Sequence, residues 1–395
     1  MVILFVAGLC GLSLAIWLGL TFARGGFWKS DQRLEPAGER ADWPEVVAVI
    51  PARNEAPTIG RTVASLLGQD YAGEFQVIVV DDNSDDGTAE AARDAVGQSE
   101  RLQIVQGKPL EAGWSGKLWA VQQGIEAVSR RIPDVAYVLL TDADIEHAPE
   151  NLRELVWKAE TDGRDLVSLM VLLRAASFWE KLLIPAFVFF FQKLYPFAQV
   201  NDPVKRTAAA AGGCILVRRE TLDRAGGIAS IRNRLIDDCA LAAAVKDKGP
   251  IWLGLTDRTK SLRAYDHLSE IWNMVARTAF VQLDHSIVNL AGTLVGMVIL
   301  YLVPPGAMVF GLAGGDAGAL TPLIGILGAA TWSLMATLYW PTLKLYRMHP
   351  LWSLTLPISG FLYSLMTLSS AIRHWRGSGG AWKGRSYSAA GSVDG

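Results

Sequence analysis

The chain has 395 residues, of which 51% are hydrophobic and 19% are charged. A typical soluble protein has about 25% charged residues, so the composition argues against an ordinary soluble enzyme and excludes a disordered chain. The formal charge of −2 gives no electrostatic attraction for nucleic acid, and we expect no such partner. The three cysteines fit no zinc-ligand spacing and cannot all pair, which excludes a disulfide scaffold.

The first 23 residues carry no charged side chain and are long enough to cross a bilayer as a helix. A cleaved signal peptide would carry basic residues before the apolar run, whereas Arg24 and Lys29 follow it. We therefore expect a transmembrane anchor over 1–23, with the chain after it in the cytoplasm.

The middle of the chain, 45–285, has the pattern of an α/β unit. Strands are expected at 45–51, 75–80, 102–105 and 135–141, and helices at 57–69, 88–96, 117–131 and after Pro149. This alternation predicts a doubly wound, largely parallel sheet. Ligands bind beyond the carboxyl ends of the strands in such sheets, and acidic residues follow two of these strands.

The first acidic cluster begins with Asp81 and Asp82 at the end of the second expected strand. Turn chemistry explains 83–88, but it does not explain two carboxylates directly on a hydrophobic strand end. A carboxylate there can accept hydrogen bonds from a ribose or a base. No G-x-G-x-x-G follows the first strand, so a dinucleotide fingerprint is absent.

The second cluster, Asp142-Ala143-Asp144, follows the fourth expected strand. Residues two apart in an extended chain point to the same side. Two such carboxylates can share one hard cation and leave its open positions to a diphosphate. A surface turn is the alternative, and the position at a strand end favours a metal site.

The third cluster is Asp237-Asp238, at the start of a helix-like run. Acidic residues at a helix start can simply interact favourably with the positive end of the helix dipole. The functional interpretation is that one carboxylate acts as a general base toward a hydroxyl, with a pKa raised by charge crowding.

These motifs resemble the family 2 glycosyltransferases of the GT-A fold, over about 45–285. The ordered matches are Val49–Glu55, Val79–Thr88, Thr141–Asp144 and Asp237–Leu241. The apolar flanks and the tail Trp382–Tyr387 are most similar to the hopanoid-cluster (hopene-associated) glycosyltransferases, with carotenoid glycosyltransferases as relatives.

The resemblance implies a nucleotide-sugar site. Asp82 would bind the uridine of a UDP-sugar, with Pro51 and Glu55 lining the nucleotide pocket. Asp142 and Asp144 would hold Mg²⁺ or Mn²⁺ against the diphosphate.

The resemblance also implies an inverting transfer with Asp238 as the base, and Asp237 replaces the commoner glutamate of that motif. Lys117, near a helix start, is expected to meet phosphate, and Gly213 to let the backbone approach the sugar. The processive relatives carry Q-x-x-R-W, of which only Arg277 is present, which argues against a polysaccharide polymerase. Arg277 would assist the leaving diphosphate or be an ordinary helix-surface arginine.

The segment 178–200 is rich in phenylalanine and contains Pro185 and Pro196. A transmembrane span here would separate Asp142 from Asp238. We expect instead an interfacial amphipathic segment, broken at the prolines, that presents a lipid hydroxyl to Asp238. A buried core helix is the alternative.

Residues 286–395 contain only eight Asp, Glu, Lys or Arg residues. Three uncharged stretches, at 286–315, 317–343 and 348–372, are each long enough to span. We expect transmembrane helices over 286–372 and a basic tail over 373–395. Three full spans would leave that tail outside, against the positive-inside rule, so the last stretch is re-entrant or interfacial, or the rule fails here.

The expected protein is a multi-pass enzyme of the inner (plasma) membrane with a cytoplasmic catalytic domain. It would transfer a sugar from a UDP-sugar to the hydroxyl of a lipid, with a hopanoid-like acceptor. The alternatives are glycosylation of a carotenoid, polyprenyl or ceramide-like lipid, a nucleotidyltransferase, and a non-catalytic lipid-binding protein on the same fold.

Overall fold

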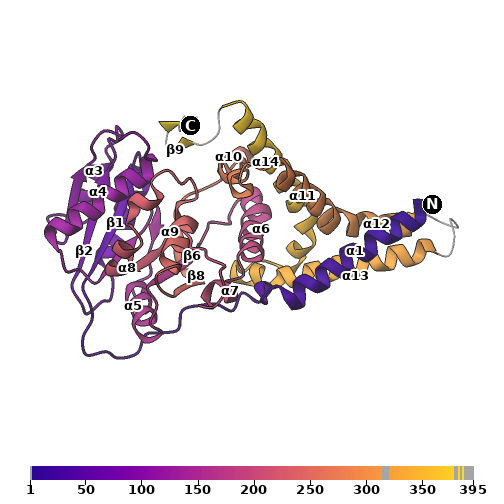
Figure 1. The fold of residues 1–395 in the computed structure, drawn as a ribbon, viewed down its shortest axis with the longest axis horizontal. Coiled ribbons are helices and arrows are strands. Elements are labelled where there is room, and N and C mark those ends of the chain that lie inside the picture. Colours follow the sequence, from indigo (N-terminus) through magenta and orange to yellow (C-terminus); the bar gives the residue numbers. More distant parts are fainter. Residues whose placement is uncertain (1, 314–319, 378–380, 383–384, 387–395) are drawn as a thin grey trace.

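The computed structural model describes residues 2–313, 320–377, 381–382 and 385–386. It has an α/β domain on one side and a set of long helices on the other, with three further helices between them (Figure 1). The expected α/β architecture is confirmed.

The domain is built on an eight-stranded sheet with the order β3-β2-β1-β4-β7-β6-β8-β5. The strands are β1 (Val46–Ala52), β2 (Phe75–Asp81), β3 (Leu102–Gln106), β4 (Tyr137–Leu140), β5 (Ile145–Glu146), β6 (Leu166–Leu172), β7 (Ile215–Arg218) and β8 (Ile251–Ser261). Strands β1 to β4 are parallel, as expected, but β7 runs antiparallel to both β4 and β6. The sheet is therefore mixed, because the chain between β6 and β7 leaves and re-enters at the same edge instead of crossing a face.

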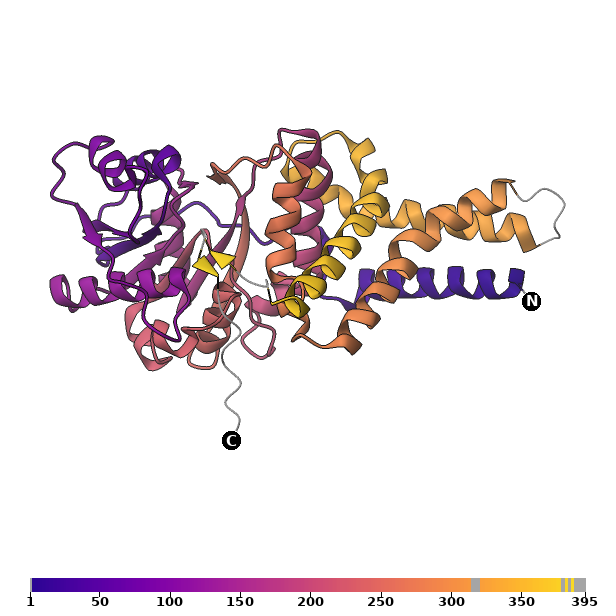
Figure 2. The ribbon, with the colours of Figure 1, turned by 90° about the horizontal axis from the view of Figure 1, so that it is seen from above.

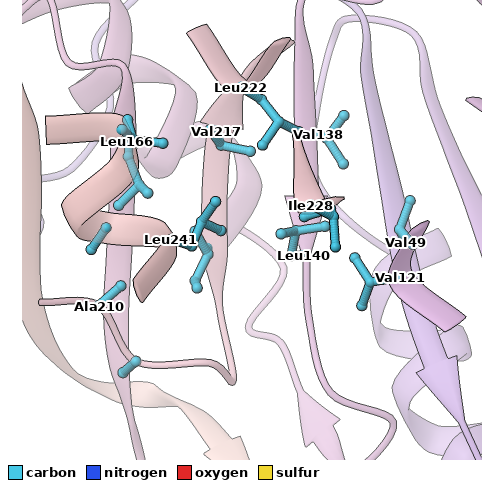
Figure 3. Close-up of a cluster of buried hydrophobic side chains, with 14 of the residues drawn as sticks. Val49, Val121, Val138, Leu140, Leu166, Ala210, Val217, Leu222, Ile228 and Leu241 are labelled. Atoms are coloured by element: carbon cyan, nitrogen blue, oxygen red, sulfur yellow. The ribbon is translucent and has the colours of Figure 1, made fainter. Parts of the chain in front are cut away.

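Helices cover both faces of the sheet. They are α2 (Ala56–Leu67), α3 (Thr88–Asp94), α4 (Gly116–Arg131), α5 (Asn151–Thr161), α8 (Arg219–Arg224) and α9 (Asp237–Lys246). Figure 3 shows one core cluster, in which Val49 and Leu140 from the sheet face Val121 of α4 and Leu241 of α9 lies nearby. These side chains are buried, and at about 25 cal/mol per Å² of apolar surface removed from water they stabilise the sheet edge that carries the acidic residues.

Within the described residues, four helices are long and apolar enough to cross a membrane: Ile3–Ala23, Ile287–Ala313, Leu320–Leu345 and Pro350–Trp375. They contain α1 (Val2–Ala23), α11 (Ile287–Met297), the π-helical turn η4 (Val298–Leu302), α12 (Val303–Ala313), α13 (Leu320–Leu345), the 3-10 turn η5 (Pro350–Thr355) and α14 (Leu356–Trp375). In Figures 1 and 2, α1, α12 and α13 extend away from the domain, whereas α14 lies beside the domain.

Helices α12 and α13 pack unusually closely. A Cβ added at Gly311 would lie 2.3 Å from the Cα of Gly325. Such contacts between small residues are typical of helix pairs in membranes, where dispersion rather than the hydrophobic effect favours association.

Three helices separate the sheet from the long helices: α6 (Phe178–Leu194), α7 (Phe197–Asn201) and α10 (Leu268–Thr278). The expected break at Pro185 is wrong, because α6 continues through it. A capping box at Ser177 and Glu180 and burial of Leu183 and Phe189 offset the backbone hydrogen bond that proline removes. The helix ends before Pro196, as expected, and its contact with a membrane interface stays a prediction.

Candidate functional site

The carboxyl edge of the sheet opens into a cavity of about 680 Å³. Nine of the ten site residues predicted from the sequence line it: Pro51, Glu55, Lys117, Asp142, Asp144, Gly213, Asp237, Asp238 and Arg277. They come from β1 and the turn after it, the starts of α4 and α9, the turn after β4, the loop before β7 and the end of α10. The fold therefore brings together residues that are up to 226 positions apart in the sequence (277 − 51).

Asp82 is the exception. Its side chain is fully buried, and it is not among the described residues that line the cavity. Its backbone N–H donates to the carbonyl of Ala52 at 2.8 Å, and the backbone carbonyl of Asp82 accepts a hydrogen bond from the Arg53 guanidinium. The contact of Asp82 with a nucleotide stays a prediction.

The two carboxylates of the D-x-D pair each meet a basic side chain. The Lys117 ammonium lies 3.0 Å from Asp142 Oδ1, and the Arg263 Nε lies 2.7 Å from Asp144 Oδ2. Behind them, the Thr141 hydroxyl donates to the carbonyl of Gly213 at 2.8 Å and lies 2.9 Å from Nε2 of His147. Burial lowers the pKa of His147 to about 3, so this histidine is a neutral support for the loop.

Lys117 links two of the acidic clusters. Its Nζ lies 3.0 Å from Asp142 and 3.1 Å from Asp237 Oδ2. Burial alone would lower the pKa of Lys117, but Asp142 and Asp237 raise it above its ordinary value, so the side chain stays charged. Gly212 leaves room for this arrangement, since a Cβ there would lie 3.3 Å from Nζ and 3.6 Å from Oδ2 of Asp238.

Asp238 lies in the first turn of α9. Its Oδ2 accepts a hydrogen bond from the N–H of Gly212 at 3.0 Å, and its Oδ1 accepts one from Cys239 at 2.7 Å. Burial, and then the neighbouring charge of Asp237, raise the pKa of Asp238 to about 6, against the opposing effect of Lys117. Charge crowding is the cause that the sequence indicates, but burial is the larger one. A carboxylate with this pKa is mostly ionised at neutral pH and can accept a proton.

The sequence reasoning missed Arg263. It follows β8, and its Nη2 lies 2.9 Å from Oε1 of Glu55 while its Nε contacts Asp144. The guanidinium therefore joins the ends of β1 and β8 across the site. A signal was present, because Arg263 comes two residues after a long strand that ends at this edge.

Arg277 lines the cavity from the last turn of α10 and is exposed. Arg277 is therefore on a helix surface that faces the cavity, and its contact with a diphosphate stays a prediction. The tail residue Lys383 and the side chain of Arg385 lie outside the described residues.

Away from the acidic residues, the cavity is apolar. Its wall there includes Phe187 and Phe190 of α6, Met297 of α11 and Tyr363 of α14. One continuous space therefore runs from Asp238 to helices long enough to cross a membrane.

A divalent metal has a limited set of ligands here. Among the residues that the structure describes, no group of three or more His, Cys, Asp or Glu side chains is arranged to hold one. Mg²⁺ is commonly bound by one or two carboxylates together with substrate phosphates and water. Asp142 and Asp144, which line one cavity, fit such a site completed by a diphosphate.

Comparison with known proteins agrees with this geometry. Residues 47–226 match the family model "Glycosyl transferase family 2". The α/β domain therefore has the sequence pattern of a family 2 glycosyltransferase. A beta-monoglucosyldiacylglycerol synthase of Trichormus variabilis is 24% identical over 229 residues, which are 57% of this chain and 45% of that protein. An N-acetylglucosaminyltransferase of Mesorhizobium japonicum is 54% identical over 50 residues, which are 12% of this chain and 11% of that protein.

The matched segments thus span less than half the length of these two relatives. Among solved structures, the α/β domain and its helices resemble the mannosyltransferase PcManGT from Pyrobaculum calidifontis, in complex with GDP-Man and Mn²⁺. The TM-score is 0.52 at 18% identity, covering 92% of this chain and 99% of that one. This similarity is one of fold, and the expected GT-A architecture is confirmed.

Proposed function

We propose that this protein is a membrane-bound, inverting, metal-dependent glycosyltransferase that transfers a sugar from a UDP-sugar to a lipid hydroxyl, with a hopanoid as the first acceptor to test. The observation that carries the proposal is the single cavity shared by Asp142, Asp144 and Asp238 at one end and by aromatic side chains at the other. The similarity to a lipid glucosyltransferase supports a lipid acceptor.

The chemistry follows from the positions of the charged groups. Asp238 removes the proton from the acceptor hydroxyl as its oxygen attacks the anomeric carbon from the face opposite the diphosphate. The bond between that carbon and the diphosphate oxygen breaks, and the electron pair leaves with the nucleoside diphosphate. Lys117 and Arg277 balance the negative charge on the leaving group. A divalent metal held by Asp142 and Asp144 would neutralise the diphosphate further.

We also propose that the catalytic domain and the chain end after α14 face the cytoplasm. The turn before α14 contacts α6, since the rings of Trp352 and Phe178 lie 6.0 Å apart. The other end of α14 contacts α10, because Arg373 donates to Asn273 at 2.9 Å. Both α6 and α10 follow strands of the sheet directly, so both ends of α14 face the domain (Figure 2).

In this arrangement α1, α11–α12 and α13 cross the membrane and α14 does not. The basic residues Lys344, Arg347, Arg373 and Arg376 then share one side, in agreement with the positive-inside rule. In intact cells, a cysteine at Arg376 should resist a membrane-impermeant maleimide until lysis, whereas one at Leu320 should react at once. Labelling of both in intact cells would contradict the arrangement.

The activity is tested on the purified full-length protein with Mn²⁺. Release of nucleoside diphosphate is followed for a panel of UDP- and GDP-sugars, with and without hopanoid, diacylglycerol or polyprenyl lipids, for wild type and Asp238→Asn. Lipid-stimulated release that disappears in the variant supports the proposal. Pyrophosphate release from a nucleoside triphosphate would instead indicate a nucleotidyltransferase, and equal function of Asp238→Asn in cells would indicate a non-catalytic protein.

A further inference from the structure

A basic side chain lies in the apolar half of the cavity. Lys193 is in the last turn of α6 and lines the cavity together with Phe187 and Phe190. Its Nζ donates a hydrogen bond to the Tyr301 hydroxyl at 2.7 Å and lies 4.8 Å from the centre of that ring and 5.3 Å from that of Phe190. In the described part of the chain, no carboxylate lies within ion-pair distance of this ammonium.

Among the residues that the structure describes, the one charged group that shifts the pKa of Lys193 is also basic. Arg24 donates from Nε to the carbonyl of Lys193 at 3.1 Å and from Nη2 to that of Leu194 at 2.9 Å. Arg24 thus caps the end of α6 and adds positive charge beside Lys193. Burial, and then Arg24, lower the pKa of Lys193 to about 8. A cation kept in an apolar site by two aromatic rings and one hydroxyl lacks the anion that normally offsets its desolvation.

Lys193 lies on the same cavity wall as the residues that adjoin Asp238. Two residues further on, the Tyr195 hydroxyl donates to Gln282 at 2.9 Å and lies beside the Cys239 thiol. Cys239 adjoins Asp238, so the cavity wall continues from the proposed base through Tyr195 to Lys193. A ligand with a hydroxyl at Asp238 would therefore bring the next part of its headgroup toward the ammonium.

We propose that Lys193 binds the phosphate of an anionic lipid that serves as the sugar acceptor. This inference rests on the proposed function, because it names the class of lipid that enters the same site. A phosphate supplies the missing anion, and the aromatic wall suits the hydrocarbon chain that a phosphate-bearing lipid also carries. The phosphate belongs to a phosphodiester beside a free hydroxyl, as in phosphatidylglycerol, so that the phosphate binds Lys193 while the hydroxyl reaches Asp238. A polyprenyl phosphate has no hydroxyl apart from its phosphate and cannot occupy both positions.

The test compares wild type, Lys193→Met and Lys193→Arg as full-length protein in detergent. Lys181→Met is the matched control, since Lys181 lies in the first turn of the same helix and is not among the described residues that line the cavity. Each protein is offered dioleoyl phosphatidylglycerol, undecaprenyl phosphate, dioleoylglycerol and a hopanoid alcohol. Lipid retention is measured by native mass spectrometry, and transfer by the radiolabelled sugar recovered in the lipid extract.

We expect wild type and Lys181→Met to retain a phosphate-bearing lipid over the neutral lipids. Lys193→Met should weaken this retention at least tenfold and raise the KM for the lipid while changing kcat and the KM for the UDP-sugar little. Lys193→Arg should restore most of the binding, since it restores the cation. Undecaprenyl phosphate should be retained through Lys193 but should not accept the sugar, because it has no hydroxyl beside its phosphate, whereas phosphatidylglycerol should do both.

Retention of phosphate-bearing lipids that Lys193→Met does not change would overturn the inference. Transfer to dioleoylglycerol, the hopanoid or undecaprenyl phosphate as fast as to phosphatidylglycerol would overturn it as well. The failure of the proposed function has a different signature. Retention that depends on Lys193, without sugar transfer to any lipid, would support the phosphate site and reject the glycosyltransferase activity.

Discussion

Replacing Asp238 by asparagine should abolish the proposed sugar transfer and also change the stability of the protein in a pH-dependent way. The ordinary pKa of this carboxyl is 3.8, and in the folded protein it is raised to about 6. The folded state therefore holds this proton more tightly than the unfolded chain does. The stability that results is fully present below pH 3.8 and is lost as the pH rises through 6.

The size of the effect follows from the shift. A difference of about 2.2 pKa units costs about 3 kcal/mol once Asp238 is ionised, at about 1.36 kcal/mol per unit. Because the side chain is partly open to the cavity, solvent screening reduces this to about 2 kcal/mol. Asparagine has one oxygen to accept the two N–H groups of Gly212 and Cys239, and the lost hydrogen bond costs about 1 kcal/mol at either pH.

The assay is thermal or chemical unfolding of the purified protein at pH 4 and at pH 8, followed by tryptophan fluorescence. The free-energy difference between Asp238→Asn and wild type should move by about 2 kcal/mol in favour of the variant from the lower to the higher pH. Asp237→Asn is the control. It removes the same charge one residue away, but it also removes a 3.1 Å ion pair with Lys117, so it should destabilise the protein at pH 8.

If the difference in the free energy of unfolding between Asp238→Asn and wild type is the same at both pH values, the reasoning is refuted, because the Asp238 carboxyl would then have an ordinary pKa. In the transfer assay, the variant should lose about 10² to 10⁴ in kcat, the range expected for a general base. Wild-type kcat/KM should fall as the pH drops below about 6, as Asp238 becomes protonated.

Three further changes test other parts of the structure. Asp142→Ala should weaken UDP binding in the presence of Mn²⁺ at least tenfold by calorimetry, and unchanged affinity would argue against the metal site. Lys117→Met leaves two half-buried carboxylates without their shared cation and should lower the free energy of unfolding by about 1 to 2 kcal/mol; an unchanged unfolding midpoint would contradict this. Gly325→Leu should lower the free energy of unfolding by about 1 to 3 kcal/mol, because a Cβ at this position would lie 2.9 Å from the Cα of Gly311. Gly296→Leu is the control and should leave that free energy unchanged, because no atom lies within 4 Å of its Cβ position. Equal effects of the two substitutions would count against the packing argument.

The sequence predicted the α/β domain and most of the site because both depend on local patterns. A buried strand has the sequence pattern of a short apolar run. An acidic residue that directly follows such a run is easily recognised, because it contrasts with the apolar residues before it. Asp142 and Asp144 were identifiable for that reason. Asp238 does not follow a strand but lies in the first turn of α9, and the resemblance of 237–241 to a family motif identified it. Parallel strands bring their carboxyl ends to one edge, so order along the chain was enough to predict that the ends of β1 and β4 meet.

Tertiary structure alone decided the features that depend on contacts between distant segments. Arg263 reaches Asp144 and Glu55 only because β8 ends at the same edge, and arginine has no local pattern that marks such a role. The continuous α6 was missed because a proline normally breaks a helix, whereas burial between the sheet and the long helices here offsets the lost hydrogen bond.

Hydropathy likewise predicted which helices can cross a membrane, but not how each is oriented. The last apolar stretch has the length of a span, yet both of its ends contact helices that leave the sheet. Hydropathy measures the transfer of each side chain from water, whereas orientation depends on which surfaces pack together. That packing exists only once the chain has folded.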